Sequence, residues 1–186
     1  MSADGRVTVY TIGHSNRSTD ELAALLAAHR IGALVDVRRY PTSRWPQFRR
    51  DALAKALAAR GVDYAHEERL GGHRESSEDS PHVALEATFR GYADHLATAV
   101  FRRAALDQLA RAARERIVVM CAEREPERCH RKLLADFLVA RGARVVHVVG
   151  PGEAREHELD PRVLVRSPDV LVYARSGDEQ LELFRG

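Results

Sequence analysis

Cysteine, lysine and long apolar segments are all scarce in this chain of 186 residues. Only two cysteines are present, and the only lysines are Lys55 and Lys132, so nearly all of the basic charge is arginine. No apolar segment approaches the roughly 18 residues needed to span a membrane. The first ten residues lack the basic start and apolar stretch of a signal peptide. Two cysteines without such a signal indicate a reducing environment, so we expect a cytoplasmic protein with no membrane partner.

Strong net charge is also missing. The formal net charge is +2, so bulk charge by itself indicates no partner. Hydrophobic residues make up 45% and charged residues 30% of the chain, which is typical of a soluble globular protein. A chain of this length can bury a core without disulfides or metals. With no internal repeat or low-complexity linker, we expect one domain over residues 1–186, and the sequence leaves the oligomeric state open.

The remaining pattern is an alternation of strands and helices. Strands are expected at 7–12, 33–37, 62–66, 116–121 and 143–149. Helices are expected from Thr19 to before Gly32, and at 51–60, 84–98, 100–114 and 126–142. We therefore predict an α/β fold with a mainly parallel sheet and helices on both faces, a Rossmann-like three-layer architecture. Residues 67–83 are expected to form a long loop, with its possible role as a lid left open.

Polar residues follow three of the predicted strands. His14 and Ser15 follow the first, Asp36 and Arg38 end the second, and Cys121 and Glu123 end the strand at 116–121. In open parallel sheets, ligands bind beyond the carboxyl ends of the strands. If the sheet is parallel, these side chains lie at one edge of the domain, which is the expected site.

The two cysteines lie eight positions apart, and the second is followed by His130. One interpretation is that both are small buried hydrophobic residues. A second is a reactive thiolate near a helix N-terminus. A third is a metal held by Cys121, Cys129 and His130, with His14 as a fourth ligand. On a helix over 126–142, Cys129 and His130 would point about 100° apart, which makes joint ligation awkward. We expect no cofactor, and this metal site remains the alternative.

Residues 38–50, "RRYPTSRWPQFRR", contain five arginines, three aromatic residues and no acid. Arginine forks bind phosphate oxygens, and aromatic rings stack on bases. This composition predicts a nucleic-acid-binding segment. Its expected contacts are Arg39, Arg44, Trp45, Arg49 and Arg50. The alternative is a solvated loop that Trp45 or Phe48 anchors to the core.

Two shorter segments add candidates. The Gly-His-Ser turn at 13–15 leads into a helix and can present backbone N–H groups to an anion. Asp36 can either orient His14 or pair with Arg38. The segment "LGGHR" (70–74) places two glycines in the long loop, where they can lie over such a site.

Taken together, "TIGHS", "DVRRYPTSR", "LGG", "CAEREPERCHR" and "HVV…EHEL" follow one another in an order and spacing that resembles the bacterial and archaeal domain-of-unknown-function family 488. The resemblance runs from about residue 8 to about residue 160. It implies an α/β domain with a site built from signature residues, and its name implies no activity. Mapped onto this chain, these residues are His14, Ser15, Asp36, Arg38, Pro41, Ser43, Gly71, Gly72, Cys121, Glu123, Cys129, His130 and Arg131.

We interpret these residues as an anion-binding cleft for a nucleotide or nucleic acid. Arg38 and Arg131 would hold a phosphate or carboxylate, and His14 or His130 would transfer a proton, oriented by Glu123 or Asp36. Cys121 would lie near the chemistry. Ser15, Ser43, Gly71, Gly72 and Cys129 would complete the ligand site. Whether the protein is an enzyme stays open, because two alternatives fit the same residues. One is a non-catalytic nucleic-acid-binding or regulatory module that uses residues 38–50. The other is a Cys/His metal or redox site. The tail, 161–186, is expected either to pack on the domain or to extend the sheet.

Overall fold

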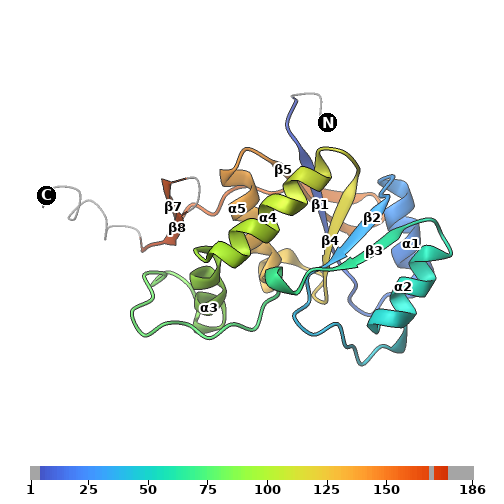
Figure 1. Ribbon diagram of the computed structural model, residues 1–186, viewed down its shortest axis with the longest axis horizontal. Helices are drawn as coiled ribbons and strands as arrows, with labels where there is room; N and C mark the ends of the chain where they lie inside the picture. The colour runs from blue at the N-terminus through green and yellow to red at the C-terminus, as the bar shows by residue number, and fades with distance from the viewer. Residues whose placement is uncertain (1–4, 168–169, 176–186) are drawn as a thin grey trace, which may run out of the picture.

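The computed structural model describes residues 5–167 and 170–175, and its described part is built around a six-stranded sheet (Figure 1). The strands of this sheet are β1 (Thr8–Gly13), β2 (Ala33–Asp36), β3 (Asp63–His66), β4 (Ile117–Cys121), β5 (Arg144–Gly150) and β6 (Glu153–Glu156). The helices are α1 (Thr19–Ala28), α2 (Arg50–Ala58), α3 (Ala87–Leu96), α4 (Ala99–Ala112) and α5 (Arg131–Ala140). Three short 3₁₀ turns are η1 (Pro46–Phe48), η2 (Glu68–Leu70) and η3 (Pro126–Arg128).

The strand order is β3-β2-β4-β1-β5-β6. The first five strands in the chain are parallel, and β6 pairs antiparallel with β5 at the edge. The predicted α/β fold with a mainly parallel sheet is confirmed. Strand β6 was not predicted, because all four of its side chains are exposed and it carries no apolar pattern.

Helices cover both faces of the sheet, as the continuous apolar strands required. All five residues of β4 are buried, and its side chains alternate between two core clusters. Val118 and Met120 pack with the apolar sides of α1 and α2. Val119 and Cys121 pack on the opposite face with residues of α3, α4 and α5. Cys121 therefore reaches the site from the α3–α5 side of the sheet.

The start of α1 was predicted correctly, whereas the start of α5 was not. Ser18 and Glu21 form a reciprocal capping box that begins α1 at Thr19, as expected. The helix expected over 126–142 begins only at Arg131, and that prediction was wrong for residues 126–130. Pro126 opens η3, which ends at Arg128, and the next residue, Cys129, is extended with φ −137° and ψ 147°. The apolar spacing of four residues in the sequence continues through this non-helical segment and hides the break.

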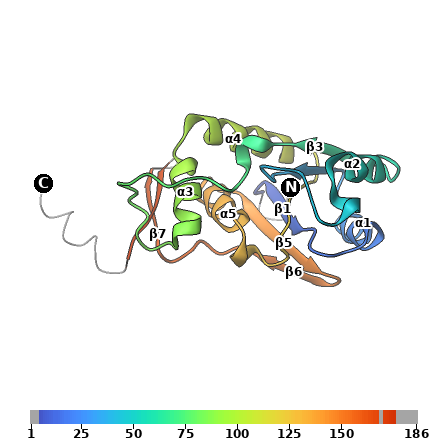
Figure 2. The same ribbon diagram turned by 90° about the horizontal axis from the view of Figure 1, so that it is seen from below.

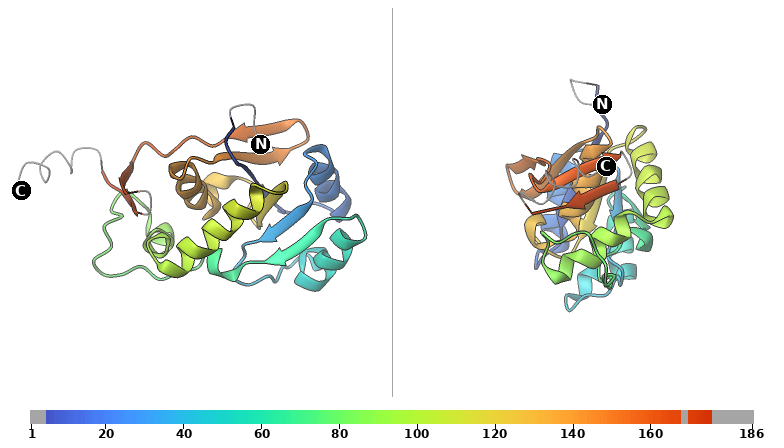
Figure 3. Two further views of the ribbon diagram at one scale, coloured as in Figure 1. Left: turned by 45° about the horizontal axis from the view of Figure 1, so that its top comes forward. Right: turned by 90° about the vertical axis from the view of Figure 1, so that its left-hand side faces the viewer.

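The tail forms its own small sheet. Strands β7 (Val163–Ser167) and β8 (Val170–Tyr173) pair antiparallel with each other and not with the main sheet. Figure 3 shows the β7–β8 pair apart from the edge of the main sheet, and Figure 2 shows α3 between this pair and α5. Tyr173 is fully buried in the core cluster of α3, α4 and α5. The expected tail from 176 onwards lies outside the described residues. In the part of the chain that is described, the helices are all too short or too polar to cross a bilayer.

Candidate functional site

The carboxyl ends of β1 and β4 lie side by side at the edge predicted for the site. Beyond the strands, the His14 N–H donates to the Cys121 carbonyl at 2.9 Å, and the Ser15 N–H donates to the Ala122 carbonyl at 2.8 Å. Gly13 permits this close approach, because a Cβ there would lie 1.7 Å from the carbonyl oxygen of Glu123. The loop after β4 is thereby held against the end of β1.

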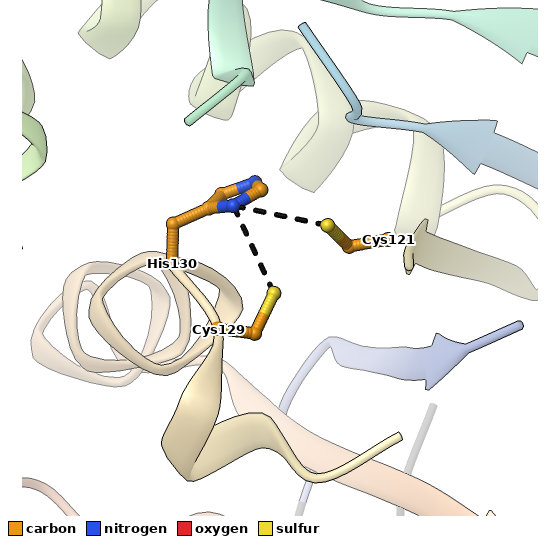
Figure 4. A group of neighbouring side chains, drawn as sticks. All are labelled: Cys121, Cys129 and His130. Carbon is orange, nitrogen blue, oxygen red and sulfur yellow. Dashed lines mark hydrogen bonds between the residues drawn. The ribbon is translucent and has the colours of Figure 1, made fainter. Parts of the chain in front are cut away.

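Two thiols and an imidazole converge at this edge (Figure 4). The Nδ1 atom of His130 lies 3.8 Å from Cys121 Sγ and 3.7 Å from Cys129 Sγ. The three atoms all lie within 4.8 Å of one another. Both cysteines are buried, with 7% of Cys121 and 4% of Cys129 exposed, and neither forms a disulfide. The cysteine–histidine cluster is defined here as Cys121, Cys129 and His130.

The backbone explains why neighbouring residues can face the same point. Cys129 is extended and lies outside α5, whereas His130 already has helical dihedral angles and caps the helix. The expectation that Cys129 and His130 point about 100° apart assumed that both were helical, and the structure overturns it. Both side chains instead face Cys121.

The imidazole of His130 fits a slot that only glycine permits at position 72. A Cβ on Gly72 would lie 2.7 Å from His130 Nδ1. The ring centroid of Tyr92, from α3, lies 4.8 Å from that of His130. His130 Nε2 is buried and has no hydrogen-bond partner among the described residues. Packing against Gly72 and Tyr92 therefore positions the ring.

Arg131 is buried beside the cluster, with only 1% of it exposed. Its guanidinium donates to Thr11 Oγ1 at 3.3 Å, to the carbonyls of Glu123 and Arg124, and to Cys129 Sγ at 3.4 Å. Within the described residues, no carboxylate lies at ion-pair distance from Arg131. A buried charge is costly without a partner, so Cys129 is the group placed to offset it.

The two thiols have opposite pKa shifts. Burial alone raises the pKa of Cys129, but a hydrogen bond from Cys121, together with His130 and Arg131, brings that pKa well below its ordinary value. The same hydrogen bond, followed by burial, raises the pKa of Cys121 well above its ordinary value. The pair therefore favours a Cys129 thiolate beside a protonated Cys121 thiol.

The cluster opens onto a cleft of about 770 Å³. Besides the cluster and Gly72, its wall includes His73, Arg74, Glu86, Phe89, Tyr92, Glu123, Glu127 and Arg128. Among the described residues, Arg74 donates only to the carbonyls of Gly71 and Glu68, at 3.0 and 3.1 Å. Glu123 is exposed and lines this cleft, while its backbone carbonyl accepts from Arg131. A second cleft of about 750 Å³ shares His73 and Arg74 and continues to Arg39 and Tyr40.

Asp36 and Arg38 form a separate buried group. The Arg38 guanidinium donates to both carboxylate oxygens of Asp36, at 2.8 and 2.6 Å, and the Tyr64 hydroxyl donates to Asp36 at 2.8 Å. Of the two roles considered for Asp36, the structure shows the pairing with Arg38. Both side chains are buried, and neither lines the cleft of the cluster.

Arg38 also fixes the loop that follows it. Its Nη1 donates to the carbonyls of Phe48 at 2.9 Å and Thr42 at 3.3 Å, and lies 3.3 Å from His14 Nε2. His14 Nδ1 lies 2.8 Å from the Ser15 carbonyl, so this nitrogen carries the hydrogen and Nε2 accepts from Arg38. Burial lowers the pKa of His14 to about 4. In this geometry His14 and Arg38 act within the fold, and their roles toward a ligand stay predictions.

Residues 38–50 present an arginine surface, defined here as Arg39, Arg44, Arg49 and Arg50 with Tyr40 and Trp45. Tyr40 is 60% exposed. The guanidinium of Arg39 lies 5.5 Å from the Tyr40 ring centroid, and that of Arg44 lies 5.3 Å from the Trp45 ring. Phe48 is fully buried and anchors the segment. Ser43 Oγ accepts from the Trp45 N–H at 3.1 Å, and the Pro41 carbonyl accepts from Arg50 N–H at 3.1 Å, so both stabilise the turn.

Sequence reasoning missed the part of the cleft that α3 supplies. Tyr92 and Phe89 lie in an amphipathic helix whose pattern indicates only a buried face. Arg74 and Arg128 had no distinguishing spacing in an arginine-rich chain. The one available signal was their position next to "LGG" and "CHR", the segments that resemble the family.

A polar network behind the cluster was also missed. Thr11 Oγ1 lies 2.6 Å from His147 Nδ1, and His147 Nε2 lies 2.9 Å from His157 Nδ1. His157 Nε2 lies 2.9 Å from Asp136 Oδ1, and the Tyr173 hydroxyl donates to Asp136 Oδ2 at 2.8 Å. Because Thr11 also accepts from Arg131, the network joins the cluster to α5 and β8.

Comparison with known proteins identifies the family that the sequence resembles. The sequence profile of the domain of unknown function DUF488 matches residues 18–138. No curated protein and no solved structure matches the chain. The match spans β2 and β4, the cysteine–histidine cluster and most of α5.

Proposed function

Because the chain belongs to the DUF488 family, whose name carries no activity, we propose its function from the site itself: an enzyme that acts on a phosphate-bearing ligand, a nucleotide or a nucleic acid strand. The ligand binds in the cleft above the cysteine–histidine cluster, which is the reactive centre. The convergence of two buried thiols and an imidazole on one cleft carries this proposal. Simple binding does not require such a costly buried arrangement.

The arginines of the cleft support an anionic ligand. Arg74 and Arg128 line it, and no carboxylate in the described chain lies at ion-pair distance from either. Burial lowers the pKa of Arg74, and the nearby Arg39 acts in the same direction. A bound phosphate would offset both effects, because it stabilises the charged guanidinium. These two arginines take the role that the sequence suggested for the buried Arg38 and Arg131.

The other groups of the cleft suit the rest of a nucleotide. Phe89 offers an aromatic ring for a base. Glu86, Glu123 and Glu127 can accept hydrogen bonds from sugar hydroxyls and base amino groups. A ligand with a phosphate at one end and hydrogen-bond donors at the other matches this combination of arginine, aromatic and glutamate side chains better than a bare anion does.

Ligand-dependent thermal stability tests the binding part of the proposal. The panel contains phosphate, mono- and dinucleotides, and short single- and double-stranded oligonucleotides. A ligand at about 100 times its dissociation constant adds roughly 2.7 kcal/mol of apparent stability. We expect stabilisation by one nucleotide class, and a loss of it in Arg74→Gln/Arg128→Gln but not in the control Arg103→Gln/Arg114→Gln. No stabilisation by any member of the panel would contradict the proposal.

Turnover tests the catalytic part. The stabilising ligand is incubated with the protein, and the products are analysed by mass spectrometry. We expect His130→Asn and Cys129→Ser to abolish product formation and to retain ligand binding. Undiminished turnover in both variants would remove the cluster from the chemistry.

A second candidate function, non-catalytic nucleic acid binding, is favoured by the arginine surface. In the described chain, Arg44, Arg49 and Arg50 have no carboxylate at ion-pair distance, and all three are exposed. Aromatic rings lie under Arg39 and Arg44. The cleft shared by Arg39, His73 and Arg74 leads from this surface toward the cluster, so a bound strand can reach both.

A further inference from the structure

The cysteine–histidine cluster has the donor atoms of a metal centre. We propose that Cys121 Sγ, Cys129 Sγ and His130 Nδ1 are three protein ligands of a thiophilic divalent cation, zinc in the first place. This site does not depend on which ligand the cleft binds. It deepens the proposed function by naming a cofactor for the cluster, which that proposal takes as the reactive centre.

The spacing of the three atoms fits tetrahedral coordination. With Zn–S bonds of about 2.3 Å and Zn–N bonds of about 2.0 Å, a tetrahedral centre holds nitrogen and sulfur about 3.5 Å apart and two sulfurs about 3.8 Å apart. The observed nitrogen–sulfur distances are 3.8 and 3.7 Å, with all three atoms within 4.8 Å of one another. To reach this geometry each nitrogen–sulfur pair contracts by a few tenths of an ångström, and the two sulfurs, which lie within 4.8 Å of each other, approach by up to about 1 Å. The extended Cys129 and the slot over Gly72 already aim the side chains at one point (Figure 4).

The chemistry of the donors selects the class of metal. Two sulfurs and one imidazole nitrogen favour zinc and other soft or borderline cations. Magnesium and calcium require oxygen ligands, and the candidate ligand group contains no carboxylate. Two thiolates match the charge of a divalent cation.

Residues around the proposed metal site donate hydrogen bonds to its sulfur ligands, and one coordination position faces the cleft. Arg131 Nε donates to Cys129 Sγ at 3.4 Å, and the Ala122 backbone N–H interacts with Cys121. Such contacts orient ligands and reduce the charge on sulfur. All three ligands line the cleft, so the fourth coordination position faces it. Three protein ligands with one open position are the pattern of catalytic zinc sites, whereas structural zinc sites are closed.

The test measures metal on the purified full-length protein without any nucleotide. Bound zinc is quantified by elemental analysis, and cobalt(II) is then substituted and its absorption spectrum recorded. We expect about one metal per chain, sulfur-to-cobalt charge-transfer bands, and visible bands of tetrahedral intensity. Cys121→Ser, Cys129→Ser and His130→Ala should each weaken zinc affinity by more than about 100-fold. The control His29→Ala, an imidazole outside the cleft, should bind as wild type does.

A second measurement does not require the variants to fold. In wild type, zinc should slow the alkylation of both thiols at least tenfold, and a chelator should restore the rate. Equal alkylation rates with and without zinc would overturn the proposal. So would cobalt spectra without charge-transfer bands, or a cobalt spectrum unchanged in Cys121→Ser/Cys129→Ser. Nucleotide stabilisation is recorded separately on chelated protein, so a failure of the metal site is distinguished from a failure of the proposed function.

Discussion

Gly72 shows at the scale of one residue how a signature glycine shapes the site. The missing Cβ leaves the space that His130 Nδ1 occupies. We expect Gly72→Ala to lower the free energy of unfolding by about 1 to 3 kcal/mol, because the ring or the loop must shift. Urea denaturation measures this change. In Gly32→Ala, the added Cβ has no neighbour closer than 3.9 Å, so this control should change stability little. Equal effects in both variants would show that His130 does not depend on this slot.

Arg131 gives a second prediction at the same scale. The sequence suggested a phosphate-binding arginine, but its guanidinium is buried and bonds to Thr11, Cys129 and two carbonyls. We expect Arg131→Met to cost about 3 kcal/mol or more in unfolding free energy, because the carbonyls and the Cys129 thiolate lose their partner. Denaturation of wild type and Arg131→Met measures this loss. A fully stable variant that lost only ligand affinity would restore the original interpretation.

These residues show what the sequence could predict about the site. The positions Cys121, Cys129 and His130 were predicted from strand ends and from the family resemblance, and the structure brings them together. Their shared direction was not predictable, because it depends on an extended Cys129 that the apolar spacing hides. The residue type likewise indicates that an arginine is charged, but not whether it is buried. Arg38 and Arg131 are buried, whereas Arg74 and Arg128 line the cleft.

Among the elements, α5 and β8 are joined through one buried carboxylate. Asp136 accepts from the Tyr173 hydroxyl at 2.8 Å, from His157 Nε2 at 2.9 Å and from the Asp160 N–H at 2.9 Å. We expect Tyr173→Phe to cost about 1 kcal/mol of stability and Asp136→Ala about 3 kcal/mol, since the second change leaves several buried donors without an acceptor. Urea denaturation followed by far-ultraviolet circular dichroism ranks them. A larger loss for Tyr173→Phe would contradict this order.

The contact between β1 and β5 predicts a dependence of stability on pH. Burial lowers the pKa of His147 to about 3, with the neighbouring His157 acting in the same direction. Arg131 and Arg155 act in the same direction, and Cys129 opposes them. In the unfolded chain His147 becomes protonated below about pH 6.5, whereas in the folded protein it stays neutral at that pH. The contribution of His147 to the free energy of unfolding is therefore fully present above about pH 6.5 and is lost as the pH falls toward about 3.

A matched variant isolates this contribution. Between pH 6.5 and 4.5, wild type should lose up to about 1.4 kcal/mol more per pH unit than His147→Gln, the amount for one additional proton bound by the unfolded state. Urea denaturation at a series of pH values measures both slopes. Parallel slopes would mean that His147 is protonated in the folded protein.

The arrangement of elements was predictable to a different degree. Five strands and five helices were expected within a few residues of their positions, because β-branched apolar strands and helical periodicity are strong local signals. The edge strand β6 and the pairing of β7 with β8 were not predicted. Exposed residues carry no apolar pattern in β6, and pairing partners in a tail depend on contacts with α3 that local sequence does not contain.

Over the whole molecule, the basic charge is unevenly neutralised. Several arginines of α4 and of the chain after it have acidic partners, such as Arg103 with Asp107, Arg111 with Glu115 and Arg144 with Glu156. The arginine surface has none among the described residues. A net charge of +2 therefore conceals a local surface that suits a polyanion. Because each phosphate contact releases counterions, the salt dependence of binding counts the contacts.

The number of phosphate contacts, read from the salt dependence of binding, gives a prediction for the arginine surface. For a single-stranded oligonucleotide, Arg44→Ala/Arg49→Ala/Arg50→Ala should weaken binding and reduce the slope of log K against log salt concentration by about 2, since three contacts contribute roughly 0.7 each. Fluorescence anisotropy across a salt series measures both quantities. The control Arg103→Ala/Arg114→Ala/Arg116→Ala removes the same charge from other elements and should keep the wild-type slope. Equal slopes in the two triple variants would show that net charge, and not this surface, attracts the strand.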